Sequence, residues 1–378
     1  MDLTAPKIAE LEQFDPPDRV DSFATELANQ IKNGKHFIAF TGAGVSTSAG
    51  IPDFRGPEGA WTARAQGRQL DFKHTTTLQA VPSPTHMALV ELQDRGLLKY
   101  LISQNCDGLH RRSGILPDRI SELHGNSNRE HCKDCGKEFI RDFRAVATYE
   151  KSATDHRTGR KCTRCGGALH DTIINFGEDL PPQALKLALK HARKADLCLA
   201  LGSSLMVSPA NSIPKIVGKN KNANLAICNL QKTPIDENAQ LRIHTKVDDL
   251  MICLMDKLDI PIPDFILRRQ LVVEMTTQAK EQHQLKIYGV DVDQTPVSFL
   301  QSVKLENSRR PAKSEPFIFN IRDKLEPGSK LNLELEFMGH YGEPNLIIGH
   351  GFSGEEAQHS IYELDYNPRN GQWNITSH

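Results

Sequence analysis

The sequence has little net charge and no segment suited to crossing a membrane. Lys and Arg total 46 against 47 Asp and Glu in 378 residues, so the surface as a whole should attract neither nucleic acid nor anionic lipid, and a charged partner must meet a local patch. No run reaches the roughly 18 apolar residues of a membrane span, and the first residues lack a basic stretch followed by an apolar one. We therefore expect an intracellular, soluble protein that is not secreted and has no membrane partner.

Internal repeats and a disulfide framework are also absent from the sequence. Of the eight cysteines, four form two Cys-x-x-Cys pairs. The other four sit in or beside apolar runs, where we expect core positions: Cys106, Cys198, Cys228 and Cys253. Because a reducing cell interior disfavours disulfides, the pairs point to another role. The length allows two or three folding units.

Amphipathic helices alternate with short apolar strands over much of the chain. The first pair is a helix at 22–33, with Ser22 as its N-cap, and a strand at 36–40. Later helix and strand pairs are predicted at 84–95 and 98–103, at 182–194 and 196–201, and at 209–217 and 224–229. This alternation predicts an α/β fold with a Rossmann-like, doubly wound parallel sheet.

The character of the chain changes twice. Residues 129–170 are polar and basic, hold both cysteine pairs, and predict a zinc-ribbon small domain inserted into a core that spans 1–265. Residues 266–284 are expected to form a linker. From 285 to 378, alternating segments such as Leu331–Phe337 predict a C-terminal antiparallel β domain, which matches no motif that would indicate its function.

The two cysteine pairs predict a metal site. Cys132, Cys135, Cys162 and Cys165 offer four thiolates, with 26 residues between the pairs. This local spacing is typical of a zinc ribbon, whose tetrahedral site is closed to substrate, so one structural zinc ion per chain is expected. A pair of redox dithiols is the alternative.

A glycine-rich loop follows the strand at 36–40. Gly42 and Gly44 allow a sharp turn and a close approach to a pyrophosphate, and we expect the loop to open a helix whose N-terminus favours an anion. A glycine turn without a ligand is the alternative, because Thr47 replaces the third glycine of the dinucleotide fingerprint. A dehydrogenase is disfavoured, because no strand-end acid follows about 20 residues later to hold an adenosine ribose.

Polar residues follow several predicted strands, at the edge where open α/β sheets place their ligand crevice. These segments are Gln104-Asn-Cys-Asp107, Gly202-Ser-Ser204 and Asn229-Leu-Gln231. His124 is a candidate general base, since its ordinary pKa near 6.5 lets it accept a proton at neutral pH; a structural histidine is the alternative. The Gly50–Gly56 loop either closes over a ligand or is a surface connection with a local Asp53–Arg55 pair.

Taken in order, these segments resemble the sirtuin core over roughly residues 36–260. The order is Gly-Ala-Gly-x-Ser, Ile-Pro-Asp-Phe-Arg, Gln-Asn-x-Asp-Gly-Leu-His, Leu-His-Gly, two cysteine pairs, Gly-Ser-Ser and Asn-Leu-Gln. Further stretches at 54–61, 158–162, 171–177 and 247–249 are similar to the class IV branch, which is chiefly nuclear. Cys106 is a departure, because the family usually has Val or Ile there.

The resemblance implies an NAD-dependent protein-lysine deacylase, or deacetylase, that releases nicotinamide and O-acyl-ADP-ribose. In the family's reaction the acyl-lysine carbonyl oxygen attacks C1′ of the nicotinamide ribose, and the base, here His124, activates a ribose hydroxyl. Asn105 and Asp107 would line the nicotinamide pocket. The residues that the resemblance assigns to NAD are Gly42, Ala43, Gly44, Ser46, Thr47, Asp53, Phe54, Arg55, Trp61, Gln104, His124, Gly202, Ser203, Ser204, Asn229, Leu230, Gln231 and Val247.

The class IV resemblance also implies acyl-lysine proteins, above all histones, as partners and a nuclear location, otherwise a cytoplasmic one. The basic surface near 129–170, with ten Lys/Arg against six Asp/Glu, would meet chromatin, and a solvated basic face is the alternative. Two rival functions stay open: an NAD-dependent protein ADP-ribosyltransferase, and a non-catalytic scaffold that binds acyl-lysine. The acyl chain, the target lysine and the oligomeric state are not indicated.

Overall fold

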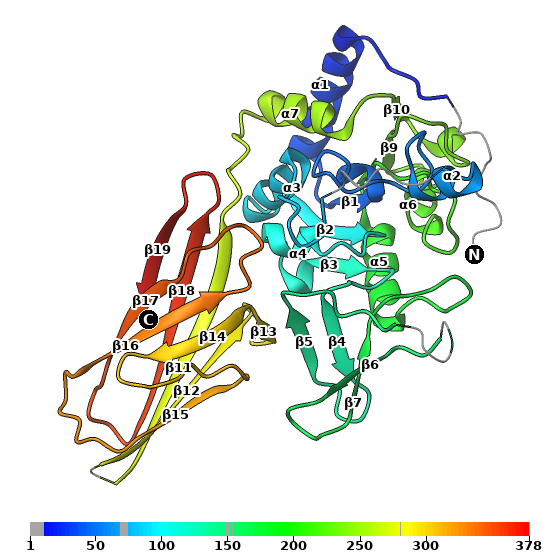
Figure 1. Cartoon of the computed structure of the whole chain (residues 1–378). Coiled ribbons are helices and arrows are strands. Elements are labelled where there is room, and N and C mark those ends of the chain that lie inside the picture. The colour runs from blue at the N-terminus through cyan, green and yellow to red at the C-terminus, as the bar shows by residue number, and fades with distance from the viewer. Residues whose placement is uncertain (1–10, 69–74, 149–151, 153, 280, 378) are drawn as a thin grey trace. The chain divides into compact units, whose positions relative to one another are not determined.

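The computed structural model describes residues 11–68, 75–148, 152, 154–279 and 281–377, and the chain divides into two compact units (Figure 1). Unit 1 consists of Met1–Ser127, Tyr149–His156 and Thr172–Phe265. Unit 2 consists of Asn128–Thr148, Arg157–Asp171 and Ile266–His378. Among the described residues, no helix is both long and apolar enough to cross a bilayer.

Unit 1 is built on a six-stranded sheet in which every pair of neighbours is parallel, in the order β10-β9-β8-β1-β2-β3. Its strands are β1 (Phe37–Thr41), β2 (Leu98–Ser103), β3 (Ile120–Glu122), β8 (Leu197–Leu201), β9 (Asn224–Cys228) and β10 (Leu241–Ile243). β1 and β8 are buried at every position, which explains their continuous apolar runs. The predicted α/β parallel sheet is confirmed.

Helices cover both faces of this sheet (Figure 1). They are α1 (Pro17–Asn33), α2 (Ala60–Ala65), α3 (Pro84–Asp94), α4 (Leu109–Ser113), α5 (Pro182–Lys194), α6 (Ser212–Gly218) and α7 (Val247–Leu258), with short 3₁₀ turns η1 (Ala43–Val45), η2 (Pro117–Arg119) and η3 (Asp236–Asn238). One apolar cluster joins α1, α3 and α7 to the sheet, and a second joins α5 and α6 to its other face. The sheet is therefore doubly wound.

Two helix starts differ from the prediction. α1 begins at Pro17 rather than at residue 22, because a proline at the first helical position needs no N–H partner. α6 begins at Ser212 rather than at 209, because residues 209–211 form turns in which the Ser212 and Ile213 N–H groups donate three residues back, to the Pro209 and Ala210 carbonyls. α3 starts as its sequence suggests: the Ser83 hydroxyl accepts the His86 N–H, and Nδ1 of His86 accepts the Ser83 N–H in return.

Unit 2 is antiparallel apart from one pair of strands. Its strands are β4 (Arg129–Cys132), β5 (Glu138–Arg141), β6 (Arg157–Lys161), β7 (Ala168–Asp171), β11 (Leu267–Ala279), β12 (Gln282–Val290), β13 (Pro296–Ser298), β14 (Leu300–Leu305), β15 (Phe317–Ile321), β16 (Lys330–Phe337), β17 (Leu346–Gly351), β18 (Ala357–Asn367) and β19 (Gln372–Ser377). β14, β16 and β17 form a separate three-stranded sheet, whose inward side chains share one apolar core with β11, β12 and β18.

The expected linker at 266–284 does not exist. β11 occupies most of it and pairs with β12 and β18, so the C-terminal domain begins near Ile266. The period-2 pattern of β11 was hidden because Val272, between the inward Leu271 and Val273, is also buried. The cysteine-bearing segment interrupts unit 1 in sequence, as predicted, and it also joins the C-terminal strands: β5 pairs in parallel with β13, so both belong to one continuous sheet.

Candidate active site and metal centre

The carboxyl ends of four strands of unit 1 lie in one row. Thr41 of β1 pairs with Ser103 of β2 and with Leu201 of β8, and Leu201 pairs with Cys228 of β9. The strand order reverses at β1, which is the position where open α/β sheets form a ligand crevice. The loops that follow these strands therefore converge.

Most of the predicted residues occupy these loops. Gly42, Ala43, Gly44, Ser46 and Thr47 follow β1; Asp53, Phe54, Arg55 and Trp61 surround the start of α2; Gln104, Asn105 and Asp107 follow β2; His124 follows β3; Gly202, Ser203 and Ser204 follow β8; Asn229, Leu230 and Gln231 follow β9; Val247 opens α7.

The glycine loop, residues 42–47, packs directly on the loop after β8. A Cβ on Gly42 would lie 2.7 Å from the Cα of Ser203, and one on Gly44 would lie 2.7 Å from the Cα of Gly202, so both positions need glycine. The Gly42 and Gly44 N–H groups donate to the carbonyls of Leu201 and Gly202, at 3.0 and 2.8 Å. These two amides are therefore used inside the protein, and an anion must be met by other groups of the loop.

The predicted α-helix after this loop is wrong. The structure has only the 3₁₀ turn η1, followed by turns as far as Gly50. The Thr47 hydroxyl donates to the Gly44 carbonyl at 3.0 Å, which competes with helical backbone bonds, and Pro52 cannot continue a helix. Any attraction for phosphate here comes from the loop itself and not from a helix dipole.

Buried polar side chains join the glycine loop to the loop after β2. The Ser46 hydroxyl donates to the Asp107 carboxylate at 2.7 Å, and the Asn105 amide donates to the Gly42 carbonyl at 3.0 Å. Asn105 and Asp107 are only 9% and 8% exposed. The two predicted pocket residues are thus held rigidly in a dry environment.

His124 is oriented by the same loop. Its Nδ1 lies 3.0 Å from the Gln104 carbonyl oxygen, which only accepts, so Nδ1 carries the proton and Nε2 is left to accept one. Burial lowers the pKa of His124 below its usual range, although the bond to Gln104 acts in the opposite direction. The Gln104 side chain in turn accepts from the Ser203 hydroxyl at 2.7 Å, which links the loops after β2 and β8.

Cys106 lies beside His124 rather than in the apolar core. Its thiol donates to the His124 carbonyl oxygen at 3.1 Å. Burial, helped by the charge of Asp107, raises the pKa of Cys106 to about 12, so it stays a neutral thiol. By contrast Cys198 and Cys228 are buried in the two apolar clusters, as predicted.

An aromatic group forms where the Gly50–Gly56 loop meets α2. The ring of Trp61 lies 4.7 Å from that of Phe54 and 5.4 Å from that of Phe176, and the Arg55 guanidinium stacks on it at 4.4 Å. Phe54 and Phe176 are 46% and 56% exposed. Phe176 was not predicted as a site residue; the signal was an aromatic side chain inside the polar stretch Asn175–Glu178.

Asp53 shapes the same loop. Its carboxylate accepts the Gly56 N–H at 2.9 Å, and a Cβ on Gly56 or Gly59 would lie within 2.5 Å of it. Burial raises the pKa of Asp53. The carboxylate therefore holds the turn of the loop.

The turn Asn229–Gln231 is held by an arginine that was not predicted. Arg242 of β10 donates to the Asn229 carbonyl at 2.8 Å and to the Gln231 carbonyl, and pairs with Asp236 at 2.9 Å. The signal in the sequence was a charged residue inside the short strand Leu241–Ile243.

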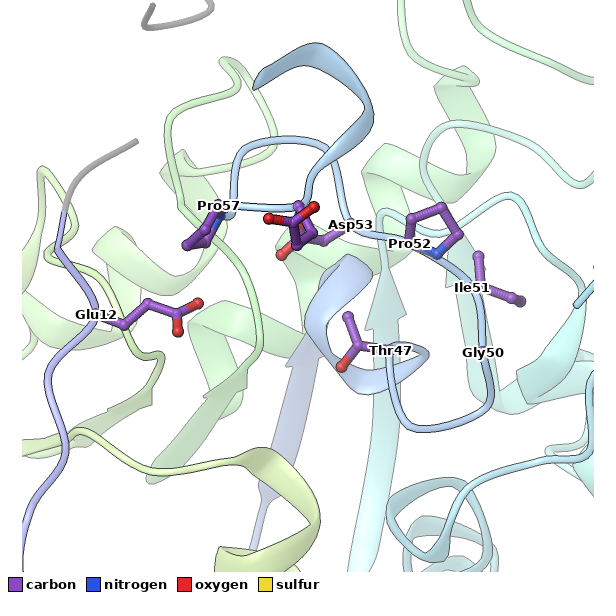
Figure 2. A pocket seen from close by; sticks show the side chains of 8 residues that line it. Glu12, Thr47, Gly50, Ile51, Pro52, Asp53 and Pro57 are labelled. Atoms are coloured by element: carbon purple, nitrogen blue, oxygen red, sulfur yellow. The ribbon is translucent and has the colours of Figure 1, made fainter. Parts of the chain in front are cut away.

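A pocket opens beside the glycine loop, lined by Glu12, Thr47, Gly50, Ile51, Pro52, Asp53, Pro57 and Glu58 (Figure 2). It includes two predicted residues, Thr47 and Asp53. Glu12 was not predicted. The N–H of the next residue, Gln13, donates to the Leu230 carbonyl at 2.9 Å, and this contact brings the segment before α1 to the site. Burial, together with the charge of Asp53, raises the pKa of Glu12.

The four cysteines of the two pairs converge in unit 2. Their sulfur atoms all lie within 4.8 Å of one another, with Cys132 to Cys165 at 3.5 Å and Cys135 to Cys162 at 3.6 Å. Zn–S bonds of about 2.3 Å in a tetrahedron place sulfur atoms roughly 3.8 Å apart, so the cluster fits a zinc ion. Four thiolates fill the coordination sphere, which agrees with a structural role.

A sheet edge that gathers loops over a glycine turn, together with a closed four-cysteine cluster, defines a Rossmann-like protein with a zinc-binding module. The Sir2 family model matches residues 68–209. The chain is 41% identical over 357 residues to the NAD-dependent protein deacetylase SRT1 of Arabidopsis thaliana, which covers 86% of this chain and 74% of the relative. It is 40% identical to human NAD-dependent protein deacetylase sirtuin-7, over 67% of this chain and 64% of that protein. The chain thus spans less than two thirds of the human relative.

Two further comparisons also find proteins of the Sir2 family. NAD-dependent protein deacetylase Sirt6 of Drosophila melanogaster is 39% identical over 67% of this chain and 81% of its own length. A solved Sir2 structure with a deacetylated p53 peptide and 3′-O-acetyl ADP-ribose is 30% identical, with a TM-score of 0.50 over 62% of this chain and 98% of that one. The chain belongs to the Sir2 family, the sirtuins, and the sirtuin-7 and Sirt6 relatives agree with the class IV resemblance.

Proposed function

We propose that this protein is an NAD-dependent protein-lysine deacylase that releases nicotinamide and O-acyl-ADP-ribose. One observation carries the proposal: the Gln104 carbonyl holds Nδ1 of His124, which leaves Nε2 able to accept a proton, at the carboxyl edge of a parallel sheet where Asn105 and Asp107 follow the neighbouring strand β2. Relatives at 39–41% identity that are named NAD-dependent protein deacetylases support it.

The proposed NAD site follows the crevice along the sheet edge. The glycine loop and the Gly202–Ser204 loop would take the pyrophosphate, the Asn229–Gln231 turn and Val247 the adenosine, and the Phe54–Trp61 segment the nicotinamide side. NAD is a co-substrate that supplies an electrophilic ribose carbon and a nicotinamide leaving group. β9 is followed by Asn229 rather than by an acidic residue, so the Asn229 amide is the proposed hydroxyl partner.

His124 does the proton chemistry in this proposal. Its Nδ1–H is fixed on the Gln104 carbonyl, and its Nε2 accepts a proton from a ribose hydroxyl. Because burial keeps the ring neutral, the base is available at neutral pH. The Asp107 carboxylate, fixed by Ser46, faces the positive charge that develops on the ribose, where a pre-placed anion is worth more than in water.

We propose histone lysines as substrates and the nucleus as the location. The support is the class IV resemblance and the sirtuin-7 relatives. Chromatin contact is proposed for the cysteine-bearing segment of unit 2. Its side chains Lys133, Lys161 and Arg164, in or beside the two Cys-x-x-Cys turns, are exposed. In the same segment Arg141 and Arg160 are bound to the buried Glu130, so part of the basic excess is internal.

The test is mass spectrometry on histone peptides that carry acetyl or longer acyl groups, with and without NAD. Loss of the acyl mass from the peptide, matched by O-acyl-ADP-ribose, supports the proposal. ADP-ribose added to protein, with no deacylated peptide, would instead favour the transferase. Tight binding of acyl-lysine without turnover of any peptide would favour a scaffold. A matched reaction with His124→Tyr controls for contaminating activity.

A further inference from the structure

Two buried histidines lie behind the glycine loop and have no assigned part in the candidate site. His86, on α3, is fully buried, and His110, on α4, is 3% exposed. Their ring centres are 4.7 Å apart. Burial lowers the pKa of both rings to about 3, so both are neutral at physiological pH.

His86 is tied to one end of the glycine loop through Ser83. The Ser83 hydroxyl donates to the carbonyl of Val45, the last residue of η1, at 3.1 Å. Nδ1 of His86 accepts the Ser83 N–H at 3.2 Å and lies 2.9 Å from its hydroxyl. Because this Nδ1 accepts, the neutral ring carries its proton on Nε2.

His110 is tied to the other end of the loop. Its Nε2 lies 2.8 Å from the hydroxyl oxygen of Thr41, the last residue of β1, which is fully buried. The Thr41 carbonyl accepts the Gln104 N–H at 3.0 Å, so the same residue also fixes the carbonyl that orients His124. Thr41 and Val45 flank the two glycines of the loop. The His110 ring therefore holds Thr41 directly, and the His86 ring holds Val45 through Ser83.

The second nitrogen of each ring takes no part in holding the loop. Within the described chain, Nε2 of His86 and Nδ1 of His110 are buried without a hydrogen-bond partner. The rings are therefore held by their other nitrogens, through the bond of His86 to Ser83 and the bond of His110 to Thr41.

We propose that His86 and His110 are positioning residues for the glycine loop, which hold its backbone in the shape that receives the pyrophosphate of a dinucleotide. The inference rests on the proposed NAD site and adds two residues to it. A pair that only fills the core is the alternative. The two alternatives predict different effects of a substitution. If the histidines position the loop, the affinity for the dinucleotide falls; if they only fill the core, the stability of the protein falls and the affinity does not.

The test measures ADP-ribose binding by calorimetric titration, which needs no turnover. His110→Phe keeps the ring volume and loses the Thr41 bond, and we expect ADP-ribose affinity to fall about tenfold, with the KM for NAD rising alongside and kcat changing less. Hydrogen exchange of residues 41–46 should quicken. His110→Gln, whose amide can reach Thr41, should restore part of the affinity. Thr41→Val should weaken binding, and combining it with His110→Phe should add little further loss.

The matched control is a second histidine pair in the same unit. His36 and His191 stack with ring centres 5.1 Å apart and share a hydrogen bond of 3.0 Å, away from the glycine loop. His191→Phe should leave ADP-ribose affinity unchanged. Native affinity in a folded His110→Phe or Thr41→Val protein, or an equal loss in His191→Phe, overturns the inference. Native protein that binds no ADP-ribose would instead overturn the proposed function.

Discussion

The two units of this protein assemble their functional side chains in opposite ways. In unit 1 the candidate active site comes from loops far apart in the sequence, which meet because parallel strands end at the same edge of the sheet. In unit 2 the four thiolates come from two short turns, each joining a pair of antiparallel strands, and a metal ion would hold those turns together. We therefore expect that one mutation can abolish catalytic activity without loss of zinc, and that another can remove the zinc without disturbing the candidate active site.

Removing a zinc ligand should have the largest effect, and only in unit 2. Cys132→Ala should reduce zinc from about one per chain to below half, because the remaining three thiolates bind weakly, and structural zinc contributes on the order of 10 kcal/mol in small modules. Hydrogen exchange over 129–171 should quicken, while calorimetric ADP-ribose binding by unit 1 stays unchanged. Cys198→Ala, in the buried strand β8, is the control and should keep its zinc. Full zinc in the Cys132 variant would refute the site.

Removing the proposed base should affect only unit 1. His124→Ala should lower kcat/KM for an acyl peptide by about 10²–10⁴-fold, as expected for a general base. Zinc content and unfolding temperature should stay native. His359→Ala, an exposed histidine of β18, is the matched control and should retain full activity. Near-normal turnover by a folded His124 variant would contradict the assignment.

The junction within unit 2 should respond to a single buried ion pair. Arg269 of β11 donates to Asp142 at 2.6 Å, with side chains 11% and 8% exposed, next to the β5–β13 pairing. Asp142→Asn leaves Arg269 without its counter-charge and should lower the unfolding free energy by roughly 3 kcal/mol. Glu326→Gln removes the exposed Lys324–Glu326 pair and should change it by less than about 0.5 kcal/mol. If calorimetric scans show the same loss of unfolding free energy in both variants, the buried pair stabilises the β5–β13 junction no more than an exposed pair would.

The smallest expected effect is a shift in the pH dependence of unit 1. Only neutral His124 can accept a proton, and burial lowers its pKa below 6.5. Activity should therefore persist as the pH falls to 6.5 and decline only as it passes below the depressed pKa. A profile of kcat/KM between pH 5 and 8 measures this. A midpoint above 6.5 would show that the ring is not buried as described.

Local patterns in the sequence predicted most of unit 1. Buried parallel strands such as β1 and β8 are continuous apolar runs, and the polar residues after them form the loops of the candidate site. The helix expected after the glycine loop was wrong, because the Thr47 hydroxyl competes for backbone bonds. Arg242 and Glu12 were not predicted as residues of the candidate site because they come from elements that carry no motif, and Phe176 was not predicted although it lies in the 171–177 stretch.

The organisation of unit 2 was less predictable. The Cys-x-x-Cys spacing indicated the metal cluster, whereas the pairing of Val297 with Ile140 has no local signature. Arg141 and Ser298, which are hydrogen-bonded beside it, are 157 residues apart in the chain. Such non-local pairing depends on the register of complete sheets and cannot be found from periodicity within one strand.

The most direct test of the central claim is the rate of nicotinamide release from NAD, measured for the native protein with an acetyl-lysine peptide, with the unmodified peptide and with no peptide. Release is expected only with the acetylated peptide, in step with loss of the acetyl group. Release that is equally fast without acyl-lysine, or none with any acylated peptide, would contradict it.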